Sequence, residues 1–236
     1  MTTTRFPAGV TNAQVGSMFQ DLQRTRPTTY FEYFNDFSTY TAADWVVTET
    51  DSGATQAVAA GASGLLALQN TGGASDINSL QFAGGTGSVR PLFQYSSSKD
   101  MFVGARFKVD DATLASFTVG LAVADTSPIA SLPANGVFIS KTGATANPSG
   151  YVAISSANVT GTITGASITA DTFFEVAMVY TADLGVWRFY LNDSAVQLTA
   201  GTLGPSALLA PTIAVGNGDA NARLLTIDWI YCASAR

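Results

Sequence analysis

Histidine is absent from the 236 residues of this chain. Ser-His-Asp and Cys-His hydrolase sites therefore cannot form, and the commonest zinc ligand is missing as well. Glycoside hydrolysis needs only two carboxylates that face a sugar, so the absence of histidine does not exclude it. The chain has three glutamates, Glu32, Glu49 and Glu175.

Two carboxylates fall in segments that we expect to be strands. Glu175 interrupts the apolar run Phe173-Phe174-Glu175-Val176, and Asp228 lies in the apolar alternation near the C-terminus. Each is either a general acid or a residue on the outward face of a strand. Asp228 has the further option of bonding to the backbone or to an arginine across the sandwich. The outward or structural role is favoured for both, so we expect no catalytic residue and no enzymatic activity.

Calcium is the more serious possibility among cofactors, because carboxylate and amide oxygens on loops suit this ion. The weak candidates are Asp110, Asp111, Asp125 and Asp219, which follow expected strand ends or lie in polar loops. Turns use the same residue types. Ordinary turn chemistry is therefore favoured, and we predict no metal and no cofactor.

Aromatic side chains bind sugars when they are exposed on a sheet. Trp45, Trp187 and Trp229 all lie within apolar alternation, which favours packing in the core.

The composition excludes several classes of partner. The formal charge is −6 and only 12% of residues are charged, which argues against a protein that neutralises phosphates, so we expect no nucleic acid. No run of apolar residues is long enough to span a membrane, and the N-terminus lacks the apolar core of a secretory signal. We therefore expect the protein to be made in the cytoplasm and to have no membrane as a partner. Cys232, the single cysteine, lies in an apolar run and is predicted to be a buried thiol.

Alternation of apolar and polar residues with a period of two predicts strands that present one side to a core. The clearest apolar series are Met101, Val103, Ala105, Phe107, Val109; Phe117, Val119, Leu121, Val123; Val176, Met178, Tyr180; Trp187, Phe189, Leu191; and Leu225, Ile227, Trp229, Tyr231. Residues 173–181 and 186–192 are expected to form one hairpin, and 136–141 and 150–155 another, because turn-forming residues lie between them. The low-complexity stretch 53–64 is expected to be a loop.

The chain is predicted to have one folded domain, residues 30–236, preceded by an arm, residues 1–29. The arm contains Pro7, Gly9, Gly16 and Pro27 and carries three arginines against one aspartate. Close-spaced strands separated by turn residues are typical of an all-β sandwich or barrel.

Four stretches give the domain a family resemblance: the opening 31–37, the strand 101–107, the hairpin end 187–192 and the closing 225–230. Their order resembles the concanavalin A-like, or laminin G-like, jelly roll. This resemblance implies two stacked antiparallel sheets with the first and last strands close together.

A narrower resemblance comes from the front end, where Thr4-Arg5-Phe6-Pro7-Ala8-Gly9-Val10-Thr11-Asn12 leads to Tyr33-Phe34-Asn35-Asp36-Phe37 and Ala43-Asp44-Trp45. This pattern is similar to capsid decoration proteins of tailed bacteriophages. It implies a virion structural protein that binds the outer surface of a phage head, with the major capsid protein and further copies of itself, as a dimer or trimer, as partners.

In this interpretation the arm contacts neighbouring protein surface. Its expected contact residues are Arg5, Phe6, Pro7, Val10, Met18, Phe19, Leu22, Arg24 and Arg26. The main alternative is a carbohydrate-binding, lectin-like module on a virion, which could use calcium to hold the sugar. An enzyme is the third hypothesis.

Overall fold

The computed structural model describes residues 29–61, 64–145, 147–164, 167–198 and 204–236. Sheet A consists of β1 (Tyr30–Asn35), β3 (Thr55–Ala59), β4 (Leu65–Gln69), β7 (Met101–Val109), β12 (Phe174–Thr181), β13 (Val186–Leu191), β14 (Ser194–Leu198) and β16 (Leu224–Ala235). Sheet B consists of β2 (Trp45–Glu49), β5 (Ile77–Phe82), β6 (Phe93–Gln94), β8 (Ala115–Ala122), β9 (Gly136–Lys141), β10 (Ser149–Ile154), β11 (Ala157–Thr162) and β15 (Leu208–Asn217).

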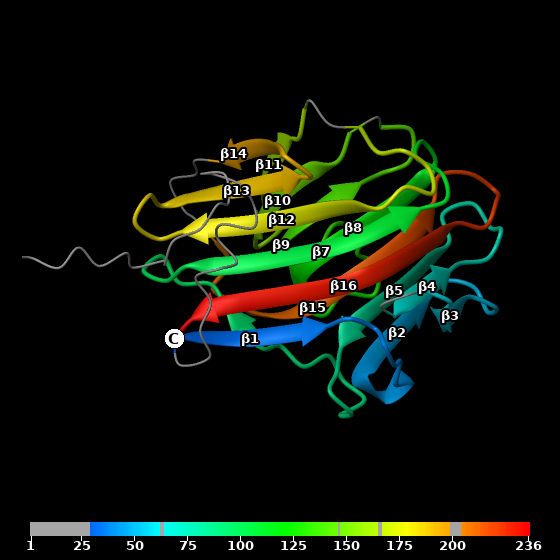
Figure 1. The fold of residues 1–236 in the computed structure, drawn as a ribbon, viewed down its shortest axis with the longest axis horizontal. Helices are drawn as coiled ribbons and strands as arrows, with labels where there is room; N and C mark the ends of the chain where they lie inside the picture. Colours follow the sequence, from blue (N-terminus) through cyan, green and yellow to red (C-terminus); the bar gives the residue numbers. More distant parts are fainter. Residues whose placement is uncertain (1–28, 62–63, 146, 165–166, 199–203) are drawn as a thin grey trace, which may run out of the picture.

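The two sheets are antiparallel and stack face to face, as the resemblance implies (Figure 1). Sheet A has the order β14-β13-β12-β7-β16-β4-β3, and β1 pairs with the C-terminal part of β16. Sheet B has the order β11-β10-β9-β8-β15-β5-β2, and β6 pairs with β15. The first and last strands are thus neighbours, and the fold class expected from the sequence is confirmed.

The core lies between the sheets and is formed by the inward side chains of the alternating series. On β7, for example, Met101, Val103, Ala105, Phe107 and Val109 are all at most 2% exposed. Trp45 and Trp187 are buried in this core, and the Cys232 thiol is completely buried, as predicted.

Trp229 was expected in the core together with Leu225 and Ile227, and this prediction is wrong. A β-bulge between Ile227 and Trp229 inserts one residue into β16, and such an insertion moves every later side chain to the opposite face. Ile230 and Cys232 therefore point inward, whereas Trp229 is only partly buried on the outward side.

The stretch 53–64 was expected to be a loop, but β3 lies within it, so this prediction is wrong. β3 pairs along its whole length with β4 at the edge of sheet A. Most of its side chains are exposed, so the backbone hydrogen bonds offered by β4 form the strand without an apolar pattern in the sequence.

Both expected hairpins are present. β12 pairs with β13, and β9 pairs with β10. The short 3-10 turn η1 (Ala42–Asp44) precedes β2. Across the described ranges, no helix has the length and apolar character needed to cross a bilayer.

Candidate functional site

The outward face of sheet B is partly covered by the segment 123–135, which we call the covering segment. Gln81 on β5 anchors its start: its Nε2 atom donates to Val123 O at 2.9 Å, and its Oε1 atom accepts from Asp125 N at 2.8 Å. Thr118 on β8 donates to Pro128 O at 3.0 Å. These bonds hold the covering segment over the middle of the sheet.

Apolar contacts fix the same segment. Ile129 packs on Ile77 of β5 and Ala214 of β15, forming a small cluster outside the main core. The end of the segment also bonds to the turn between β10 and β11, where Asn135 Oδ1 accepts from Ser155 N at 3.0 Å. The opposite ends of β9, β10 and β11 are therefore left as the place where a ligand could reach the sheet.

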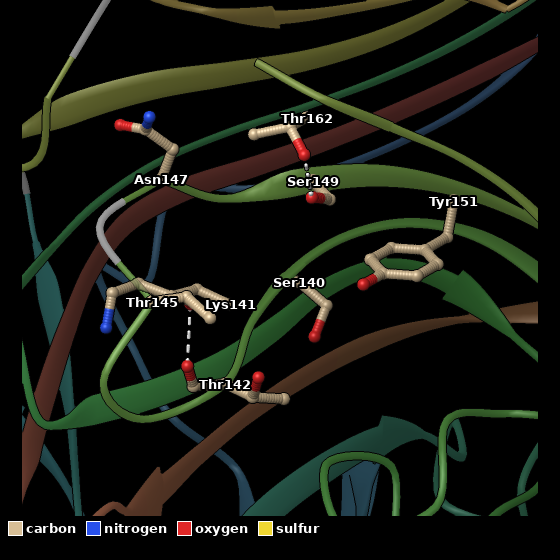
Figure 2. Close-up of a pocket in the computed structure, with 8 residues that line it drawn as sticks. All are labelled: Ser140, Lys141, Thr142, Thr145, Asn147, Ser149, Tyr151 and Thr162. Atoms are coloured by element: carbon tan, nitrogen blue, oxygen red, sulfur yellow. Dashed lines mark hydrogen bonds between the residues drawn. The ribbon is translucent and has the colours of Figure 1, made fainter. Parts of the chain in front are cut away.

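A hollow of about 340 Å³ lies at this place (Figure 2). It is lined by Ser140, Lys141, Thr142, Thr145, Asn147, Ser149, Tyr151 and Thr162. The register explains why they meet: Ser149 is paired with Ser140 on one side and with Thr162 on the other, so three hydroxyl-bearing residues lie in a row across three strands.

Tyr151 gives this row an aromatic wall. Its ring is partly exposed and stacks on the buried Phe138 ring, with centroids 5.4 Å apart and an interplanar angle of 19°. The hydroxyls are held in place, since Ser140 Oγ lies 3.0 Å from Thr118 Oγ1 and Ser149 Oγ lies 3.2 Å from Thr162 Oγ1. The arrangement offers a flat ring beside oriented donors and acceptors.

Lys141 is the only charged residue that lines the hollow, but its ammonium group is already bound. Its Nζ atom donates to Thr113 O, Ala115 O and Gly143 O at 2.8–3.0 Å, and the residue is 1% exposed. Burial lowers the pKa of Lys141 to about 8, and the nearby Asp111 carboxylate opposes this shift. Lys141 therefore braces the end of β9 rather than meeting a ligand.

Glu175 and Asp228 lie on the outward face of sheet A, far from the hollow in the fold, and both contact Arg106. Arg106 Nη1 donates to Asp228 Oδ2, and Arg106 Nε lies 3.9 Å from Glu175 Oε1. Burial raises the pKa of Glu175, and Arg106 opposes that rise. The guanidinium also lies over the Phe173 ring, so the three charged groups form a structural cluster.

The four weak calcium candidates are only partly brought together. Asp111 and Asp219 converge, but on the guanidinium of Arg223, with Nη2 at 3.5 Å and 2.6 Å from their oxygens. Asp125 lies apart and accepts from Ser127 N in a turn. Within the described ranges, no three acidic or cysteine side chains gather as a metal site would require.

Turn hydrogen bonds use these carboxylates as well. Asp111 Oδ1 accepts from Thr113 N and Leu114 N, and with Arg223 these bonds hold the pKa of Asp111 below its usual value. The side chain of Asn221, followed by Arg223, has the same effect on the pKa of Asp219. Both aspartates are therefore held in their charged form by neighbouring donors and by Arg223.

The expected arm contacts, Arg5 to Arg26, lie outside the described residues. The hollow itself was not identified from the sequence. The expected hairpin of residues 136–141 and 150–155 could have indicated it, because the pairing of these strands places Ser140 and Tyr151 on one face. The third strand, β11, carries Thr162 and has no clear apolar alternation, so the full row could not be read from the sequence.

No protein-family model matches the sequence, and no curated protein matches it. Solved structures do. A protein of unknown function from Shewanella oneidensis MR-1 has a TM-score of 0.60 at 14% identity, covering 95% of this chain and 97% of that one. The carbohydrate recognition domain of Emp47p has a TM-score of 0.59 at 12% identity, covering 88% and 98%.

A third neighbour is the endo-β-1,4-glucuronan lyase of the fungus Trichoderma reesei, with a TM-score of 0.56 at 11% identity, covering 86% of this chain and 94% of that one. At such identities the likeness shows the fold, and the chain is a concanavalin A-like, lectin-like jelly roll. The expectation that the protein is not an enzyme is overturned by this neighbour. The same sandwich carries an enzyme, and the missing histidine excludes only the reaction classes that need one.

Proposed function

We propose that the protein binds carbohydrate through the outward face of β9, β10 and β11. The observation that carries the proposal is the hollow in which the Tyr151 ring stands beside the hydroxyls of Ser140, Ser149 and Thr162 (Figure 2). Sugars present apolar C–H faces and many hydroxyls, so a stacked aromatic ring with fixed hydrogen-bonding groups matches both. The lectin-like fold supports the proposal.

The lining indicates the class of sugar. None of the eight lining residues is acidic, and the one cation, Lys141, is held by backbone carbonyls. A charged sugar would find no free counter-charge there and would lose hydration without compensation. The hollow also lies near the lower end of ligand pockets, roughly 300–1,000 Å³. We therefore propose a neutral saccharide of one or a few residues as the ligand.

The test is a glycan array followed by titration calorimetry with the best neutral glycan. Tyr151→Ala should weaken binding about tenfold, about 1.4 kcal/mol, because it removes the stacking surface. Tyr151→Phe keeps that surface and should bind within about threefold of the unsubstituted protein, a difference under about 0.7 kcal/mol. Product analysis of the same mixtures distinguishes binding from turnover.

Phe34→Ala on sheet A is the matched control, because it also removes an aromatic ring but at a site away from the hollow. Chelation of calcium should leave the affinity unchanged, since the lining has no carboxylate. A Tyr151→Ala variant that bound like the unsubstituted protein, or an array with no neutral glycan retained, would contradict the proposal.

Decoration of a phage capsid is the second candidate, and an exposed ring on sheet A favours it. Phe34 is 59% exposed on β1, close to the Tyr231 ring at a centroid distance of 6.4 Å. Exposed aromatic rings are enriched where proteins meet. The partners would be the major capsid protein and one or two further copies of this chain, on the virion surface.

Co-sedimentation with purified phage heads tests this candidate. Phe34→Ser should reduce the bound fraction, because it removes the exposed ring from the proposed contact. Leu184→Ser is the control, since Leu184 is equally exposed at 59% but lies in the turn between β12 and β13. Heads that sediment without the protein would count against decoration.

A further inference from the structure

β3 lies at the edge of sheet A. It pairs with β4 on one side along its whole length, and among the described strands none pairs with its other side. The pairing with β4 is regular and has no bulge, and β3 contains no proline and no charged residue. Edge strands usually carry a lysine, a proline or a bulge that prevents other chains from pairing with them. β3 has none of these protections.

The edge is held in a fixed position, so it can serve as a template for another strand. Gln56 Nε2 donates to Glu49 Oε1 of β2 and to Asn78 Oδ1 of β5, both at 2.9 Å. Asn78 Nδ2 donates in turn to Thr55 O at 3.1 Å. These bonds tie β3 to sheet B, so the backbone groups on its outer side keep one direction.

One side chain of β3 shows that the sandwich is open along this edge. Val58 lies opposite Leu66 in the register and therefore points to the inward face, where Leu66 is completely buried in the core. Val58 is nevertheless 49% exposed. An inward apolar side chain that is half in water lacks a neighbour on its outer side.

The opposite edge of the sandwich is closed by its own strands. There β11 of sheet B approaches β14 of sheet A so closely that a Cβ atom added at Gly161 would lie 2.7 Å from the Leu198 side chain and 3.0 Å from that of Val196. The two edge strands on that side therefore cover each other. Within the described ranges, β3 has no such neighbour, and a strand from a second molecule would supply one.

The β3–β4 hairpin carries no charge. The run from Ser52 to Ser75 has no Asp, Glu, Lys or Arg, whereas the whole chain has a net charge of −6. Two copies of an acidic protein repel each other, but at this hairpin they can meet without placing like charges together. Glu49, the acid on the neighbouring β2, already accepts a bond from Gln56. The distribution of charge therefore favours a second copy at this edge.

We propose that two copies of this chain pair through β3 in an antiparallel, two-fold arrangement, with Val58 of one copy opposite Val58 of the other. The pairing continues sheet A across both molecules and covers the exposed side of each Val58. It is closed, because each β3 uses its outer edge on the other and leaves none for a third copy. A different protein would need a complementary strand, whereas two identical uncharged strands complement each other.

In this dimer the two hollows lie at opposite ends. Gln56 joins β3 to β2, which is one end of sheet B, and β11 is the other end of that sheet. Both hollows therefore stay open, and a surface with repeated glycans would be held by two sites at once. This consequence rests on the proposed carbohydrate binding, whereas the dimer and its tests do not.

Disulfide cross-linking of the full-length protein tests the register. Val58→Cys places two thiols opposite each other with Cα atoms about 4.5–5.5 Å apart, within reach of a disulfide, so mild oxidation should give mostly covalent dimer. Thr55→Cys is the matched control on the same strand. In this register its two thiols lie about 20 Å apart, six residues along the strand, and the chains should stay single on a denaturing gel. Cys232 is completely buried and does not interfere.

Sedimentation velocity measures the dimer without a cross-link. The unsubstituted protein should have about twice the chain mass of 24.4 kDa. Val58→Lys places two like charges opposite each other and should raise the Kd of the dimer about tenfold. Leu184→Lys is the control, because Leu184 is 59% exposed in the turn between β12 and β13, and it should leave the dimer unchanged. Circular dichroism checks that both variants are folded.

Three results would overturn the proposal. The first is a protein that sediments as a monomer at every concentration, and the second is an equal disulfide yield from Val58→Cys and Thr55→Cys. The third is a dimer that Val58→Lys leaves intact, which would place the interface on another surface. Hydrogen exchange completes the test, because a monomer with slowly exchanging β3 amides would show that the same chain covers this edge.

Discussion

Lys141 carries a charge in a place from which water is excluded. Its three carbonyl partners satisfy the ammonium hydrogens, but burial still favours the neutral amine and lowers the pKa to about 8 from 10.5. Below about pH 8 both the folded and the unfolded chain hold this proton, and stability does not change with it. Above it, the folded chain loses the proton first, so stability rises with pH.

Other buried groups act in the opposite direction at higher pH. Burial raises the pKa of the Cys232 thiol and raises the pKa of Tyr33 to about 12. The unfolded chain then loses these protons first, and stability falls as pH rises above the usual pKa of each group. The free energy of unfolding should therefore stop rising at about pH 9, where the two effects cancel, and fall above about pH 10.

Urea denaturation between about pH 7.5 and 9 measures the Lys141 contribution. We expect the free energy of unfolding to rise by about 1 kcal/mol over this range, since one pKa unit corresponds to about 1.4 kcal/mol. Lys141→Met should abolish the rise, whatever its effect on stability at neutral pH. Lys99→Met, at an exposed position, should keep it. A rise of equal size in the Lys141→Met variant would contradict this assignment.

At the scale of elements, the alternation of apolar and polar residues was sufficient to predict a strand and its inward side chains wherever the strand has no bulge. β7, β8, β12 and β13 were predicted from their apolar series, and their inward residues form the core. β16 was predicted as a strand, but the bulge after Ile227 reverses its faces. A bulge depends on how β16 meets β7, which is a contact between distant segments, so the local pattern did not indicate it.

The candidate site was predictable to a smaller extent. The β9–β10 hairpin was expected, and with its register it places Ser140 and Tyr151 on the same face. Two further facts decide that this face is open there: the covering segment ends at Asn135, and Gln81 holds its start from 42 residues away in sequence. Anchors between such distant residues are set by the tertiary fold, which is why the hollow was not foreseen.

At the scale of the whole molecule, the close approach of the two sheets at β10 determines the position of the candidate site. Gly150 lies between Ser149 and Tyr151 on β10, but it faces inward. A Cβ atom at this position would lie 2.2 Å from Cγ of Phe189 on β13 of the opposite sheet. The absence of a side chain allows β10 to lie close against sheet A, and this position of β10 sets where Tyr151 stands in the hollow.

Gly150→Ala should therefore affect both stability and ligand binding. Overpacking a core by one methyl group costs about 1–3 kcal/mol, and displacement of β10 should also weaken binding of a neutral glycan. Gly143→Ala is the control, because its added Cβ atom would meet only Gly218 Cα at an ordinary 3.6 Å. Adding Phe189→Leu to Gly150→Ala should restore part of the loss, since directly contacting residues are not additive. Urea denaturation and calorimetry measure the two effects, and a Gly150→Ala variant as stable as Gly143→Ala would refute the close approach of the layers.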